Sequence, residues 1–211
     1  MKTRNEILKM RAVVLYVLQT FQEGVDYIKL FKILYFAQKE HLVKYGRGVI
    51  DDTFHALQYG PVPSFIYKSF QMLEGRLEME PDFEEFCKGI RVADKSKVIS
   101  TENSDLDELS ISDVKCLDKS IRKYKDMESY CFSGRSHDAA WREAFGRAQE
   151  DPEKDRMTLL DIAKAGHAKL GVIEYIKENI PNVAVSRTEG TYFLWIDFRK
   201  TGLTSDEINR K

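Results

Sequence analysis

The sequence is poor in cysteine and contains no long apolar run. Its three cysteines, Cys87, Cys116 and Cys131, are odd in number and show neither close pairing nor metal-site spacing, which indicates reduced thiols in a cytoplasm rather than a disulfide framework. The apolar stretch at residues 12–18 is only seven residues long, with no small-residue cleavage site after it. It therefore predicts a helix rather than a signal peptide. No stretch approaches the roughly 20 apolar residues that a membrane span requires.

An excess of either charge sign is also missing. Lysine and arginine number 33, against 34 for aspartate and glutamate, so no global field favours nucleic acid or an anionic membrane. Hydrophobic residues make up 43% and charged residues 32% of the chain, an ordinary composition for a globular protein. A length of 211 residues suffices for one good-sized core, or for one domain with an appendage.

Patterns typical of catalytic or metal sites are absent as well. The four histidines lie on separate predicted elements: His41, His55, His137 and His167. No pair has the four-residue helical spacing of a zinc site, and the sequence has no Cys-x-x-Cys and no glycine-rich phosphate loop. Cys131 and His137 would lie about 240° apart on one helix, so a nucleophile and base pair would require a bend, for which Gly134 is available. We expect no enzymatic activity, no metal and no cofactor.

The clearest helical pattern lies between residues 26 and 45. Apolar residues recur there at steps of three and four, and Asp26 is placed to cap the first turn. Gly46 should end this helix. An extended segment over residues 49–59 follows, and Gly60-Pro61-Val62-Pro63 predicts a turn, because each residue before a proline is displaced from the α region.

Further helices are predicted on both sides of this unit. Periodic apolar residues indicate helices over residues 3–22, 64–73, 111–124, 126–132 and from 159 towards 181, with an extended segment over 92–100. Residues 136–141 run into further apolar residues at positions 144, 145 and 148. The segments Ser110–Asp113 and Thr158–Asp161 have the spacing of N-terminal capping boxes. Lys29 and Lys32, three residues apart on one helix, are interpreted as a solvated rim.

The central unit resembles the Panacea domain of SocA-like antitoxins, which also occurs in phage-associated proteins. In that family a Lys-Leu-x-Lys-Ile/Leu-Leu-Tyr-Phe helix precedes a Phe-x-Ala-x-x-Tyr-Gly-Pro-Val turn, and residues 29–36 and 54–62 match these two motifs. A Ser-His pair followed by a tryptophan closes the family's domain, and Ser136-His137 with Trp141 matches it. Leu57 departs from the pattern, since many members carry an aromatic residue there, so the partner preference could differ.

The resemblance implies an antitoxin of a type II toxin–antitoxin pair. Such a protein neutralises a toxin, encoded by a neighbouring gene, through direct contact, and some members deliver the toxin to a protease. Aromatic side chains supply large contact areas at small entropic cost. We therefore expect partner binding near these residues: Tyr35, Tyr59, Gly60, Pro61, Tyr67, His137 and Trp141. Each of them is also compatible with a place in the domain's own core.

A DNA-binding phage-associated regulator is the alternative function. Its phosphate-contacting edge would consist of basic residues from the predicted helices: Lys119, Arg122, Lys123, Lys125 and Arg142. The near-neutral charge of the chain disfavours this alternative. A strong dependence of binding on salt concentration would be its mark.

The character of the sequence changes beyond about Gly171. Residues 183–199 predict two strands around a turn that contains Gly190. The stretch through Glu207, and above all residues 189–198, resembles the small domain of fold-type I pyridoxal phosphate enzymes of the cystathionine β-lyase and class II aminotransferase kind. Such enzymes need a large domain with a Schiff-base lysine, so the resemblance implies a fused or truncated remnant without activity.

Taken together, these patterns predict a mainly α protein of the α+β class. A compact helical domain with a short strand element should span residues 1–175, and an aminotransferase-like β-hairpin tail should span residues 176–211. We expect a cytoplasmic, antitoxin-like interaction protein that binds a protein toxin, whereas nucleic acid is a disfavoured partner and a membrane is not expected as one.

Overall fold

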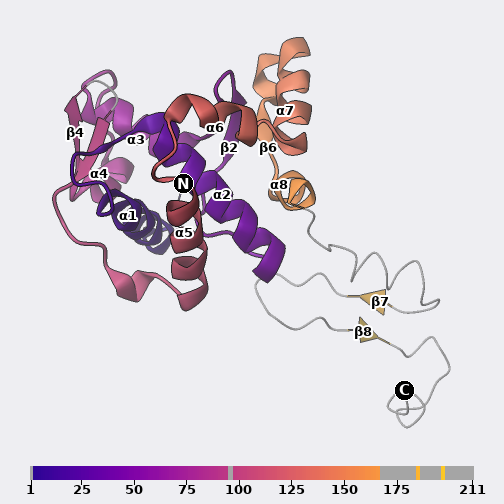
Figure 1. Cartoon of the computed structure of the whole chain (residues 1–211), viewed down its shortest axis with the longest axis horizontal. Coiled ribbons are helices and arrows are strands. Elements are labelled where there is room, and N and C mark those ends of the chain that lie inside the picture. Colours follow the sequence, from indigo (N-terminus) through magenta and orange to yellow (C-terminus); the bar gives the residue numbers. More distant parts are fainter. Residues whose placement is uncertain (1, 95–96, 167–183, 186–195, 198–211) are drawn as a thin grey trace, which may run out of the picture. The chain divides into compact units, whose positions relative to one another are not determined.

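The computed structural model describes residues 2–94, 97–166, 184–185 and 196–197 (Figure 1). The chain forms two compact units, residues 1–166 and residues 167–211. The predicted boundary at residues 175 and 176 falls outside the described residues and stays a prediction. Among the described residues, no helix combines the length and the apolar character needed to cross a bilayer.

Helices dominate the first unit, which confirms the prediction of a mainly α protein with small sheets. Its described α-helices are α1 (Arg4–Leu18), α2 (Tyr27–Tyr45), α3 (Ser64–Leu73), α4 (Pro81–Cys87), α5 (Ile111–Tyr124), α6 (Ser129–Ser136), α7 (Ala139–Glu150) and α8 (Leu159–Ala165). Two short 3₁₀ helices, η1 (Leu106–Glu108) and η2 (Pro152–Lys154), lie between them.

Helix α2 occupies the middle of this unit (Figure 1). It contacts α5, α6, α8 and strand β3 (Gly60–Pro63), and residues on nearly every side of it are buried. The side-chain oxygen Oδ1 of Asp26 accepts a hydrogen bond from the backbone N–H of Lys29 at 2.9 Å, and Gly46 ends the helix with a φ of 69°. Both predicted ends of α2 are therefore confirmed.

Two small antiparallel sheets flank the helices. One has the strand order β1 (Val25–Asp26), β5 (Lys97–Ser100), β4 (Ile90–Asp94), and the other has the order β3, β2 (Phe54–Leu57), β6 (Arg156–Met157). In the second sheet Phe54 lies opposite Pro63 and Leu57 opposite Gly60. Strands β2 and β3 therefore form a hairpin whose loop is Gln58-Tyr59.

The predicted turn at residues 60–63 is wrong, because these residues form strand β3 and the chain reverses at Gln58 and Tyr59. Pro61 and Pro63 are tolerated in a strand because β3 is an edge strand, where a missing N–H need not be replaced. In the second unit, β7 (Ala184–Val185) pairs antiparallel with β8 (Ile196–Asp197), as the predicted C-terminal β-hairpin requires. Residues 186–195 lie outside the described residues.

Candidate functional site

Lys32 lies in the protein interior, although it was predicted to belong to a solvated rim. Its exposed fraction is 1%, and its Nζ atom donates a hydrogen bond to the carbonyl oxygen of Pro61 at 2.9 Å. Burial lowers the pKa of Lys32 to about 7, because desolvation disfavours the charged ammonium. The prediction failed because α2 is covered on this side by the β2–β3 hairpin, which the spacing of two lysines cannot reveal.

Gly60 allows the hairpin to approach Lys32 this closely. Its φ is 104°, a conformation that favours glycine. A Cβ atom at this position would lie 2.7 Å from the Nζ of Lys32 and would also collide with the hydroxyl of Ser136, which is fully buried at the end of α6. The Gly-Pro pair of the motif is therefore packed against the helix that carries the other motif.

Asp138 connects α2 to the start of α7. Its Oδ2 atom accepts hydrogen bonds from the hydroxyl of Tyr35 and from the Nζ of Lys39, both at 2.8 Å. Its Oδ1 atom accepts one from the backbone N–H of Trp141 at 3.2 Å and so caps α7. Burial and the neighbouring Asp138 charge raise the pKa of Tyr35, which keeps its hydroxyl protonated as a donor. Asp138 was not among the predicted site residues, although an aspartate directly before a helix is a capping signal.

His137 and Trp141 form a stack at the same helix start. Their ring centroids lie 3.6 Å apart with an interplanar angle of 9°, and the indole Nε1 of Trp141 donates to the carbonyl oxygen of Leu57 at 2.9 Å. Burial, with the nearby charges of Lys32 and Arg142, lowers the pKa of His137. Trp141 therefore anchors the end of strand β2, directly before the Gln58-Tyr59 loop.

A cavity of about 240 Å³ opens beside this loop. Its walls are mostly apolar and aromatic and consist of Asp26, Tyr27, Ile28, Phe31, Lys32, Leu57, Tyr59, Val62 and Tyr67. Tyr59 is 60% exposed and Leu57 is 39% exposed, so they form its outer rim. The ring of Tyr67 meets that of Phe31 edge-on, with centroids 5.8 Å apart.

The structure thus separates the seven predicted binding residues into two groups. Tyr59 and Tyr67 line the cavity. The other five are scaffold: Gly60 and Pro61 lie buried against Lys32, and the side chains of Tyr35, His137 and Trp141 pack around the start of α7. Whether any of the seven contacts a partner stays a prediction.

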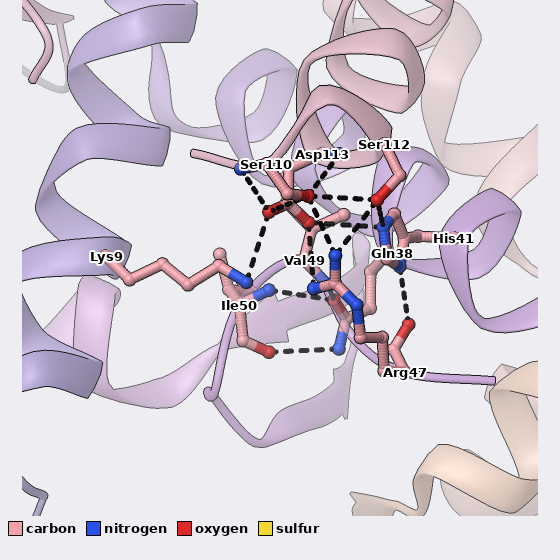
Figure 2. A network of polar contacts seen from close by, with 9 residues as sticks. All are labelled: Lys9, Gln38, His41, Arg47, Val49, Ile50, Ser110, Ser112 and Asp113. Carbon is pink, nitrogen blue, oxygen red and sulfur yellow. Dashed lines mark hydrogen bonds and ion pairs between the residues drawn. The ribbon is translucent and has the colours of Figure 1, made fainter. Parts of the chain in front are cut away.

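A second polar cluster holds the N-terminal end of α5 (Figure 2). Asp113, which is 1% exposed, lies 3.3 Å from the Nζ of Lys9 and 3.3 Å from Nη1 of Arg47. Burial alone would raise the pKa of Asp113, but hydrogen bonds from Ser110 and the charges of Lys9 and Arg47 outweigh it and lower the pKa. The Ser110–Asp113 capping box that the sequence predicts is present.

Two buried side chains of α2 extend this cluster. His41 contacts the carbonyl oxygen of Arg47 through Nδ1 at 2.7 Å and the hydroxyl of Ser112 through Nε2 at 3.0 Å. Gln38 accepts the backbone N–H groups of Val49 and Ile50 at 2.7 and 3.1 Å (Figure 2). Each of these side chains is paired with another group of the protein. We therefore assign the cluster a structural role: it fixes the loop after α2 to α2 itself and to α5.

The fold and the motif residues define a helical module built around α2 and the hairpin that packs on it. A family model described as "Antitoxin SocA-like, Panacea domain" matches residues 30–142, which is more than half of the 211-residue chain. The chain therefore belongs to the SocA-like, Panacea-domain antitoxin family, as the motifs predicted.

No curated protein and no solved structure matches the chain. The matched range ends before the tail, so it gives no support to the predicted resemblance of residues 183–207 to pyridoxal phosphate enzymes. Most of those residues lie outside the described part of the chain.

Proposed function

We propose that this protein neutralises a protein toxin by binding it directly, with the Tyr59 face as the contact surface. This face comprises the rim and walls of the 240 Å³ cavity, with Leu57, Tyr59 and Tyr67 at its centre. Membership of an antitoxin family supports an antitoxin-like role. The observation that carries the choice of face is the 60% exposure of Tyr59, an aromatic motif residue presented beside an apolar cavity.

The chemistry of the face suits a protein partner. Hot spots of protein interfaces are enriched in tyrosine and lie where an apolar side chain can fill a pocket. The Gln58-Tyr59 loop is held on one flank by the bond from Trp141 to the Leu57 carbonyl and on the other by the bond from Lys32 to the Pro61 carbonyl. A loop fixed in this way loses little conformational entropy on binding. We infer that an apolar side chain of the toxin enters the cavity.

The test begins with the neighbouring gene. Expression of the neighbour alone should arrest growth, and co-expression of this chain should restore growth while the two proteins co-purify. A harmless neighbour, or rescue without any complex, would contradict direct neutralisation. Rescue accompanied by loss of the toxin from the cell, and restored toxin levels in a protease-deficient strain, would support delivery to a protease.

The choice of face has its own test. Tyr59→Ala should weaken toxin binding by about tenfold or more, the effect of losing one interface hot spot, with an unchanged melting temperature. Leu106→Ala is the matched control, because Leu106 is also 60% exposed but lies in η1, outside the cavity. If Tyr59→Ala and the double variant L57A/Y59A both bind and rescue normally, the toxin binds elsewhere.

We also propose that the protein is not an enzyme and that its tail is an inert remnant. The thiols of Cys87 and Cys116 are buried, and burial raises the pKa of Cys87 to about 11 and also raises that of Cys116, which disfavours the nucleophilic thiolate at these two positions. The side chain of Cys131, the third cysteine, lies outside the described part of the structure. The full chain mixed with pyridoxal phosphate and dialysed should show no cofactor absorbance. Retained absorbance, or turnover of an amino acid, would contradict this proposal.

A further inference from the structure

A second cavity, of about 350 Å³, lies between α2 and α5. Its lining residues come from α2, α5, α6 and the C-terminal cap of α8: Phe36, Lys39, Glu40, Val43, Cys116, Lys119, Ser120, Lys123, Tyr124, Arg135 and Gly166. Four of them are cationic and one is a carboxylate. The cavity shares no lining residue with the Tyr59 face.

The ion pairs leave this cavity with an excess of positive charge. Glu40 is bound by two lysines, with the Nζ atoms of Lys44 and Lys119 at 2.6 and 2.7 Å from its Oε1. Burial alone would raise the pKa of Glu40, but these hydrogen bonds outweigh it and lower the pKa, so Glu40 is ionised and its charge is compensated. Lys39 is compensated by Asp138 at 2.8 Å.

Two cations remain. In the part of the chain that the structure describes, neither Lys123 nor Arg135 takes part in an ion pair, and both are exposed. Lys119, also exposed, shares Glu40 with Lys44. The cavity thus offers at least two positive charges to an incoming anion, one from α5 and one from α6.

The remaining lining residues are apolar or uncharged. Phe36 and Tyr124 stack with their centroids 4.4 Å apart, and Val43 continues this wall. At the base, the hydroxyl of Ser120 donates to the carbonyl oxygen of Ile33 at 2.8 Å, and burial raises the pKa of the Cys116 thiol, which keeps it neutral. The lining therefore combines an aromatic and apolar wall with several cations, and the Nζ of Lys39 lies 5.2 Å from the centroid of the Phe36 ring.

We propose that this cavity binds a phosphorylated small molecule of the nucleotide class. Lys123 and Arg135 would bind the phosphates, since guanidinium and ammonium groups are the usual phosphate donors, and Phe36 and Val43 would contact the base or sugar. The volume lies at the lower end of the roughly 300 to 1,000 Å³ range typical of small-molecule pockets. Four cations line this one cavity, whereas a polymer backbone needs an extended stripe of positive charge.

Calorimetric titration of the full chain tests the proposal with ADP, inorganic pyrophosphate and adenosine as probes. ADP should bind, more weakly at high salt, and more tightly than pyrophosphate, whereas adenosine should not bind. Lys123→Gln and Arg135→Gln should each weaken ADP binding by about fivefold to tenfold, the effect of one lost charge-assisted hydrogen bond. Lys115→Gln is the matched control, because it removes the same charge from an exposed position of α5 outside the cavity.

Four results would overturn the proposal. ADP that fails to bind at millimolar concentration means that no nucleotide site exists. If Lys115→Gln weakens ADP binding as much as the two cavity variants do, only the overall electrostatic field of the protein attracts the anion. Equal binding of pyrophosphate and ADP means that the apolar wall takes no part. A single-stranded DNA oligonucleotide that displaces ADP and depends on Arg122 and Lys125 means that the surface serves a polymer.

Discussion

The Nζ atom of Lys32 and the carbonyl oxygen of Pro61 lie 2.9 Å apart in the interior of the protein. This hydrogen bond joins the two motifs of the family, since Lys32 belongs to the helix motif and Pro61 to the hairpin motif. Gly60, without a Cβ atom, lets the two come together. The motif residues thus pack together as one unit. The Gln58-Tyr59 loop is the exposed part of this unit.

Substitution of Lys32 by methionine should remove a pH dependence of stability. The pKa of Lys32 is about 7 in the folded protein and about 10.4 in an unfolded chain. Between these values only the unfolded state binds the proton, so Lys32 makes the free energy of unfolding rise with pH, by a few kcal/mol in all. Urea unfolding at pH 7 and pH 10 should show a smaller rise for Lys32→Met than for the wild type.

Lys29→Met, on the same helix but half-buried, is the control and should keep the wild-type rise. Equal rises for the wild type and Lys32→Met would show that the buried amine is solvated in the folded protein. Near pH 7 the net change in stability should be small, because the removed desolvation cost is offset by the loss of the bond to Pro61.

Gly60→Ala should destabilise the protein for two separable reasons. The backbone conformation at φ 104° costs about 1–3 kcal/mol for a residue with a side chain, and the added methyl group must displace Lys32 or Ser136. Gly75→Ala isolates the first reason, because Gly75 also has a positive φ, 72°, but has open space around it. Thermal unfolding should show a clearly larger loss for Gly60→Ala. Equal losses would mean that the crowding around Lys32 relaxes without cost.

Local features of the fold could be predicted from the sequence, whereas the scaffold of the site could not. The caps of α2 and the box at Ser110–Asp113 depend on residues three or four positions apart, and such spacings are visible in one sequence. The burial of Lys32 depends on a strand 29 residues away, and the bond from Tyr35 to Asp138 spans 103 residues. Only tertiary packing decides such pairs.

Among the candidate binding residues, too, the sequence identified the motif but not the burial of its members. Tyr59 and Trp141 are both aromatic motif residues, yet one is 60% and the other 9% exposed. Their difference arises because the indole reaches back to Leu57 while Tyr59 occupies the loop itself. Family motifs could locate this unit, but which of its residues are buried scaffold and which are exposed depends on the tertiary structure.

Asp113→Asn should destabilise the protein at neutral pH by about 1–3 kcal/mol, because a buried charged acceptor of several hydrogen bonds and ion pairs is lost. The carboxylate binds Lys9 and Arg47 and closes the capping box with Ser110. Because the pKa of Asp113 is lowered on folding, this stability is present above about pH 4 and is lost as the pH falls further. Urea unfolding should therefore show a difference between variant and wild type at pH 7 that shrinks towards pH 3.

Asp107→Asn serves as the control, since Asp107 is an exposed carboxylate in the 3₁₀ helix η1 just before α5. It should change the free energy of unfolding by less than about 0.5 kcal/mol. A loss as large as that of Asp113→Asn would mean that net charge, and not the cluster in Figure 2, accounts for the effect.

Trp141→Phe should loosen the Tyr59 loop from the side of α7. The substitution keeps an aromatic ring beside His137 but removes the Nε1–H group that donates to the Leu57 carbonyl at 2.9 Å. We expect a loss of about 1–2 kcal/mol in the free energy of unfolding and faster amide hydrogen exchange at Gln58 and Tyr59. Phe145→Leu is the control, because Phe145 also stacks with Trp141, with 4.5 Å between the ring centroids, and its side chain has no donor. Unchanged exchange in Trp141→Phe would mean that the bond from Lys32 to Pro61 alone holds the loop.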